Sequence, residues 1–145
     1  MTEVAVMKKA VLVIIAIALF FLCPVAVAAD WAIFVKDSQG CPQFYDTKSI
    51  SKKGRLIKVW TKISADGYSA CKEALSAPEE VEEHRAQEMK TLIEINCTAK
   101  AFRMLATKVY ASGGMLLVDS KDPKAKWEPI TQNTVVERLS QAVCK

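Results

Sequence analysis

The sequence predicts an α+β fold: an antiparallel sheet of about six strands, with a C-terminal helix packed on it and tethered by a disulfide. Apolar and polar residues alternate in several short runs between residues 31 and 119, which is the period of strands with one buried face. The period becomes helical near the C-terminus. An even number of cysteines follows an N-terminal export signal, which is typical of small cross-linked exported domains.

The N-terminus has the three-part layout of a secretory signal peptide. Two lysines precede an uninterrupted apolar run, and small residues then allow cleavage after Ala28 or Ala29. The run is shorter than the roughly 20 residues of a membrane-spanning helix. Lipid attachment at Cys23 would need a small residue before it, where this sequence has leucine. We therefore expect residues 1–29 to be a signal peptide, and residues 30–145 to form one exported domain in the periplasm or on the outer cell surface.

The charge of the domain is mildly basic. The formal net charge of the whole chain is +4, and Glu3, Lys8 and Lys9 of the signal contribute +1 of it, so about +3 remains. A balance of this size is too weak to indicate nucleic-acid binding, and we expect no nucleic acid partner.

Three strands open the domain. Trp31–Val35 and Pro42–Asp46 are separated by the turn-forming residues of Asp37–Gly40. Proline is tolerated at the first residue of a strand, where its missing N–H is not needed. A second turn is expected at Ser51–Gly54, and Arg55–Ile63 then alternates clearly. One face of this third strand is predicted to carry Ile57, Val59, Thr61 and Ile63, and the other face Leu56, Lys58, Trp60 and Lys62.

The next stretch, Ser64–Glu88, has no clear period. Asp66 and Gly67 mark a turn. Pro78 and the acidic residues after it suit either the first turn of a short helix or a solvated loop, and we favour the loop.

Three more strands follow. Met89–Cys97 alternates with its apolar set facing the core, and Ala101–Tyr110 comes next. The residues of Ala111–Gly114 favour a hairpin to a returning strand at Met115–Asp119. A charged loop is expected at 121–126.

The last element is a helix. Thr134–Glu137 fits a capping box, in which the threonine hydroxyl accepts from the N–H of Glu137 and the glutamate reaches back. Val136, Leu139 and Val143 then recur on one helix face, which we expect to lie on the sheet.

The four cysteines of the domain allow three disulfide pairings, and their spacing alone does not decide among them. Cys97 shares the apolar face of its strand, and Cys144 lies at the edge of the apolar face of the helix. A helix lying on that face of the sheet brings Cys97 and Cys144 together, which leaves Cys41 to pair with Cys71. Zinc is the competing use of these cysteines, but there is no CxxC pair and only one histidine, His84.

Catalytic chemistry is not indicated by this sequence. A nucleophile needs a base within hydrogen-bond reach, and the single histidine lies in an acidic, irregular stretch. The acidic cluster between residues 79 and 88 is typical of a solvated surface rather than of a carboxylate pair for acid–base catalysis. We expect no catalytic residue, no metal site and no cofactor.

A basic and aromatic strand face is the best candidate for a binding surface. Basic groups beside an aromatic ring suit polyanions or acidic protein surfaces. The alternative is a solvated strand face whose charges discourage pairing of sheet edges. The candidate residues are Lys52, Lys53, Arg55, Lys58, Trp60 and Lys62.

Several short motifs occur in an order that resembles a known family. They are Trp31, Tyr45-Asp46 with Ser49-Ile50, Val59-Trp60, Ile93–Cys97, Tyr110, Trp127–Ile130 and a terminal helix ending at Cys144. This order is similar to that of the bacterial surface-adhesin protein E family of Gram-negative bacteria. The resemblance implies an antiparallel sheet with a disulfide-tethered C-terminal helix, and it implies binding of host matrix and serum proteins by the adhesin itself. Cys41, Cys71 and the Gln132-Asn133-Thr134 stretch depart from the pattern.

We therefore expect an exported, non-enzymatic binding domain that resembles surface-adhesin protein E and binds a host or envelope protein. The sequence also leaves open whether the domain forms a homodimer. The alternatives are a periplasmic inhibitor or accessory protein of an envelope partner, and a small secreted hydrolase.

Overall fold

The structure, a computed structural model, describes residues 28–72, 75 and 86–145. The predicted signal peptide lies outside the described residues apart from its last two positions. Pro78 and His84 also lie outside them.

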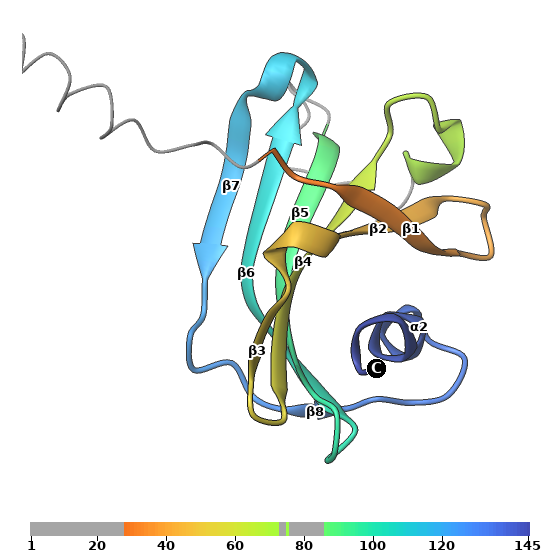
Figure 1. The fold of residues 1–145 in the computed structure, drawn as a ribbon. Coiled ribbons are helices and arrows are strands. Elements are labelled where there is room, and N and C mark those ends of the chain that lie inside the picture. The colour runs from red at the N-terminus through yellow and green to blue at the C-terminus, as the bar shows by residue number, and fades with distance from the viewer. Residues whose placement is uncertain (1–27, 73–74, 76–85) are drawn as a thin grey trace, which may run out of the picture.

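A single antiparallel sheet with a helix against one face makes up the described chain (Figure 1). Six strands form the ladder in the order β1-β2-β4-β5-β6-β7, while β3 pairs with β4 and β8 with β6. The fold class predicted from the sequence is therefore confirmed. The strands are β1 (Trp31–Lys36), β2 (Pro42–Asp46), β3 (Ser51–Lys53), β4 (Leu56–Ser64), β5 (Ala86–Asn96), β6 (Ala101–Ala111), β7 (Leu116–Lys121) and β8 (Glu128–Pro129).

The single described α-helix, α2 (Val135–Val143), begins with the predicted cap. The Thr134 hydroxyl accepts from the N–H of Glu137 at 3.2 Å. The Glu137 carboxylate accepts in turn from the N–H of Asn133, at 2.7 Å. Two N–H groups at the start of the helix are therefore satisfied by side chains, which fixes where the helix begins.

The inner face of the sheet carries the main core. Ile57 and Val59 of β4 lie directly opposite Ile95 and Ile93 of β5. Leu139 and Val143 of α2 pack against these four residues, and the helix residues are nearly inaccessible to solvent. The apolar stripe predicted for the helix thus faces the sheet, with Val136 half-buried at its edge. The remaining partly buried contributors to this cluster are Phe34, Tyr45, Ile50, Cys97, Phe102, Ile130, Ala142 and Cys144.

A second, smaller core lies at the other end of the same face. It consists of Cys41, Ala65, Cys71 and Leu75, with Ile63 and Met89 packed against it. Both cysteines of this cluster have no exposed surface.

Two disulfides join the cysteines as the sequence predicts. Cys97 is bonded to Cys144 and Cys41 to Cys71. The first ties the end of α2 to the end of β5, and the second closes the small core. Cys97 itself lies just after β5, and its N–H donates to the carbonyl of Arg55 at 3.2 Å.

The turn predicted at Ser51–Gly54 is wrong in position. Ser51–Lys53 form strand β3, which pairs with Lys58, Ile57 and Leu56 of β4. The turn consists of Gly54, with φ +60°, and Arg55, which therefore lies before the strand rather than in it. The turn residues are polar on both sides of the glycine, so composition alone does not show where pairing begins.

Other strand boundaries differ by a few residues. β5 begins at Ala86, inside the stretch assigned to a loop, and β7 runs from Leu116 to Lys121. The two-residue strand β8 has no periodic signal at all. Strand ends depend on which backbone groups find a partner across the sheet, and the sequence of one strand does not contain that information.

Candidate functional site

The outer face of the sheet is the face opposite α2, and it carries Lys58, Trp60 and Lys62. Residues that are paired across antiparallel strands share a face, so the strand register places the other side chains of this surface. The six residues predicted as a binding surface do not form one continuous patch, because the register separates them into different surroundings.

The tip of the β3–β4 hairpin carries three of the predicted residues. Lys52, Lys53 and Arg55 are all exposed. Lys53 pairs with Leu56 and so projects on the outer side. Lys52 pairs with Ile57 on the inner side, and its amine donates to the carbonyl oxygen of Lys145 at 3.1 Å. Lys53 and Arg55 are therefore the two exposed charges that the tip offers to a partner.

Lys58 belongs to an ion-paired cluster around a buried carboxylate. The side chain of Glu94 on β5 is only 4% exposed and lies 3.6 Å from the Lys58 amine. Arg103 on β6 donates to the same carboxylate through Nε at 2.6 Å, and its Nη2 forms an ion pair with it. The ring of Trp127 stacks on the Arg103 guanidinium, 4.6 Å from ring centre to Cζ. Lys58 thus shares one carboxylate with Arg103, and its side chain is still 49% exposed, so it remains available to a partner but is held toward Glu94.

Trp60 is half-buried rather than an exposed aromatic. Its backbone N–H donates to the hydroxyl of Ser49 at 3.0 Å, and this hydroxyl donates to the carbonyl of Asp46 at 2.8 Å. Ser49 is part of the short helix η1 (Thr47–Ser49), which is capped by the Asp46 carboxylate accepting from the N–H of Lys48. The short helix therefore anchors this part of β4.

Lys62 lies in a row of three lysines that crosses the sheet. It is directly opposite Lys90 of β5, and Lys90 is directly opposite Lys108 of β6. The Lys62 side chain is only 18% exposed. Periodicity does place Lys90 on the outer face of its strand, but only the register places the three lysine positions side by side on neighbouring strands. The sequence reasoning missed Lys90 and Lys108 for this reason.

Aromatic rings lie beside two lysines of this row, Lys62 and Lys90. The Lys62 amine lies 4.6 Å from the centre of the Trp31 ring and 5.4 Å from that of Phe44. The Lys90 amine lies 5.1 Å from the centre of the Tyr110 ring. Cation–π contacts of this length are attractive and hold the ammonium groups against the rings.

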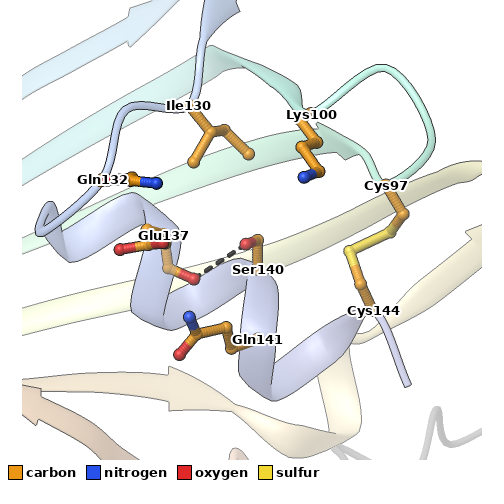
Figure 2. A pocket seen from close by; sticks show the side chains of 8 residues that line it. All are labelled: Cys97, Lys100, Ile130, Gln132, Glu137, Ser140, Gln141 and Cys144. Carbon is orange, nitrogen blue, oxygen red and sulfur yellow. Dashed lines mark hydrogen bonds between the residues drawn. A yellow bond between two sulfur atoms is a disulfide. The ribbon is translucent and has the colours of Figure 1, made fainter.

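A pocket of about 460 Å³ opens beside the Cys97–Cys144 disulfide (Figure 2). It lies between α2, the segment before α2 and the turn that follows β5, and Figure 2 shows the disulfide at one end of its wall. Two of its polar groups are already used by the helix, because Glu137 accepts from Asn133 and the Ser140 hydroxyl donates to the carbonyl of Glu137. The lining residues are Cys97, Lys100, Ile130, Gln132, Glu137, Ser140, Gln141 and Cys144.

No group of three metal-binding side chains occurs among the described residues. His84, the single histidine, lies outside the residues that the structure describes. No helix in the described part of the chain is both long and apolar enough to cross a membrane.

Comparison with known proteins gives a consistent result. The family model described as "Surface-adhesin protein E" matches residues 31–145. No curated protein sequence matches the chain.

Solved structures of protein E from Haemophilus influenzae share the fold. The structure from a non-typeable strain superposes with a TM-score of 0.53 at 17% identity, covering 83% of this chain and 79% of that one. A second crystal form of the H. influenzae protein gives a TM-score of 0.53 at 18% identity, covering 83% of this chain and 91% of that one. Identity at this level speaks for the fold alone.

The family match spans the sheet, both described disulfides and the terminal helix, including the Trp127–Ile130 segment that crosses to α2. The chain therefore belongs to the surface-adhesin protein E family.

Proposed function

We propose that this chain is an exported, non-enzymatic binding domain whose partner is a protein of the host surface or of the bacterial envelope. The observation that carries the proposal is the family match over residues 31–145. Fold similarity by itself would not be enough, because one fold serves many functions.

The tip of the β3–β4 hairpin is the surface that we propose for first contact with the partner. Lys53 and Arg55 are exposed there, and neither takes part in an ion pair among the described residues. Unpaired, exposed charges raise the rate at which an oppositely charged protein surface associates. An acidic patch on the partner would fit this tip.

Immobilised mature protein, residues 30–145, tests the proposal against purified matrix and serum proteins and against envelope extract. The double variant Lys53→Ser/Arg55→Ser removes the two exposed charges of the tip. Lys124→Ser/Lys126→Ser is the matched control, because both lysines are exposed and lie in the loop between β7 and β8. We expect the tip variant to weaken capture about tenfold, mostly through slower association, and the control to retain it.

Equal loss in both variants would show that only net charge matters, and capture of no protein by the wild type would overturn the proposal. Hydrolysis of a panel of ester, peptide and glycoside substrates by the purified domain would contradict the non-enzymatic part.

Export is part of the same proposal. We propose that residues 1–29 act as a signal peptide, so the protein recovered from the envelope should begin near Ala29 or Asp30 by mass spectrometry. Labelling intact cells with a membrane-impermeant amine reagent then separates the two locations. A surface adhesin is labelled, whereas a periplasmic accessory protein is labelled only after the outer membrane is opened.

A further inference from the structure

The lysine row on the outer face carries an arrangement that the fold alone does not need. Lys62, Lys90 and Lys108 stand directly opposite one another on three adjacent strands. Like charges placed directly opposite across strands are destabilising. The three lysines together therefore lower the stability of the sheet.

The neighbouring carboxylates offset this cost only in part. Glu88 lies 3.0 Å from the Lys90 amine and 3.8 Å from the Lys62 amine, so one carboxylate serves two ammonium groups. Asp119 lies 3.9 Å from the Lys108 amine, near the limit of an ion pair. Three ammonium groups thus face two carboxylates, and the row keeps an excess of positive charge.

Part of each ammonium-bearing side chain is open to solvent. The side chains of Lys90 and Lys108 are each 32% exposed, against 18% for Lys62. Trp31 lies between two of the lysines, since its ring centre is 4.6 Å from the Lys62 amine and 5.9 Å from the Lys90 amine. The row therefore combines fixed positive charges with flat aromatic surfaces at one place.

We propose that the row Lys62, Lys90 and Lys108, together with Trp31 and Tyr110, binds an anionic polysaccharide that carries sulfate or carboxylate groups. The charged groups of the polymer bind the three lysines, and the apolar faces of its sugar rings stack on the aromatic rings. Two interstrand spacings of about 5 Å give the row a length of about 10 Å, which suits a short stretch of a regularly charged chain. This ligand class goes beyond the proposed function, since all three lysines lie outside the hairpin tip that is proposed to contact a protein partner.

The site favours a polysaccharide over a protein or a nucleic acid. Trp31, Phe44 and Tyr110 are half-buried against the ammonium groups, so each leaves only part of a ring exposed, which suits a flat sugar ring better than the inserted apolar anchors that dominate protein interfaces. The net charge of the chain, +4, is low for a protein that binds nucleic acid through its phosphates. A sulfated or carboxylated glycan needs only a local row of cations and flat ring surfaces.

Binding of a short heparin fragment of defined length, measured by calorimetry on residues 30–145, tests the proposal. The variants Lys90→Gln and Lys108→Gln should each weaken binding about threefold to tenfold, and the double variant by more than tenfold. Lys124→Gln/Lys126→Gln removes an equal number of positive charges, two, from the loop between β7 and β8. This control should change the affinity for heparin less than about twofold. Urea unfolding of each variant checks that the fold is intact.

Three outcomes would overturn the proposal. The wild type binds no heparin, or the control pair weakens binding as much as the row variants do, or single-stranded DNA or polyglutamate of equal charge displaces the fragment equally well. Tryptophan fluorescence provides a second readout that does not depend on charge. In Trp60→Phe/Trp127→Phe the remaining tryptophan is Trp31, and heparin should change its emission. An emission that heparin leaves unaltered in this variant would place the ligand elsewhere.

Discussion

At the scale of single residues, Glu94 shows how the outer face can bury a charge. Its carboxylate is almost fully enclosed, yet it accepts a hydrogen bond from Arg103 Nε, forms an ion pair with Arg103 Nη2 and lies near the Lys58 amine. Trp127 covers the guanidinium from the other side. A buried charge is tolerated when it is paired and hydrogen-bonded, and it becomes costly once its partner is removed.

Replacing Arg103 by methionine should therefore destabilise the domain by about 2–3 kcal/mol, because Glu94 would remain buried with only the half-exposed Lys58, 3.6 Å away, as a partner. Lys108→Met on the same strand is the matched control. Its ion pair with Asp119 is long and partly exposed, and removing its charge also relieves repulsion from Lys90, so the change should stay below about 1 kcal/mol in either direction. Urea unfolding measures the free energy of unfolding of both variants. Equal changes would show that the Arg103–Glu94 pair stabilises the domain no more than the Lys108–Asp119 pair does.

At the scale of elements, the Trp127–Ile130 segment shows what its motif does. Trp127 stacks on Arg103, the next two residues form β8 against β6, and Ile130 packs into the main core. The N–H of Ile130 also donates to the carbonyl of Lys100 at 2.8 Å. The segment thus fastens the chain across the end of the sheet and delivers it to the start of α2 on the inner face (Figure 1).

The cap of α2 should contribute about 1 kcal/mol to stability. Thr134→Ala removes the hydroxyl that accepts from the N–H of Glu137, so one N–H at the start of the helix loses its partner. Thr131→Ala is the control, since the hydrogen bond described for Thr131 uses its backbone carbonyl rather than its side chain. A loss in free energy of unfolding for Thr134→Ala that does not exceed that of Thr131→Ala would contradict this account.

The two disulfides differ in access, and we expect them to be reduced in sequence. Cys97 and Cys144 are half-buried and line the pocket beside α2, whereas Cys41 and Cys71 have no exposed surface. Reduction requires a thiolate to reach a sulfur atom, so the Cys97–Cys144 bond should open first as dithiothreitol is raised. Alkylation followed by mass spectrometry identifies the labelled cysteines. Earlier labelling of Cys41 and Cys71 would refute the expectation.

At the scale of the whole molecule, each of the two cores has its own cross-link. The 47-residue separation of Cys97 and Cys144 corresponds to about 4 kcal/mol in the chain-entropy model, and the 30-residue separation of Cys41 and Cys71 to slightly less. Small domains have a total stability of about 5–15 kcal/mol. The cross-links are therefore a large share of what keeps this sheet and its helix together.

The domain should accordingly fold only where disulfides form. Residues 30–145 produced in a reducing cytoplasm should be largely unfolded or far less stable than the oxidised domain, as judged by circular dichroism and thermal unfolding. Produced with export, the same residues should show a single cooperative transition. A reduced domain with an unchanged Tm would show that the cores suffice without cross-links.

Prediction from the sequence succeeded where a signal repeats along one element. Alternation along Arg55–Ile63 predicted which face of β4 is buried, and the threonine and glutamate at the start of α2 predicted its cap. The two periods together placed Cys97 and Cys144 on facing surfaces, and the structure confirms that pairing. Each of these inferences needs only the geometry of a single strand or helix.

Only the tertiary structure decided how the outer face is used. Lys58, Trp60 and Lys62 alternate on one strand, but their surroundings differ. Lys58 lies beside the buried Glu94 carboxylate, Trp60 is hydrogen-bonded to the short helix η1, and Lys62 lies opposite another lysine. The position of β3 and the pocket beside the disulfide depend in the same way on segments that are distant in the chain. The sequence by itself determined the periods, the cysteine count and the export signal layout, because these are local. Which side chains meet was decided by strand pairing, because each pairing depends on two strands at once.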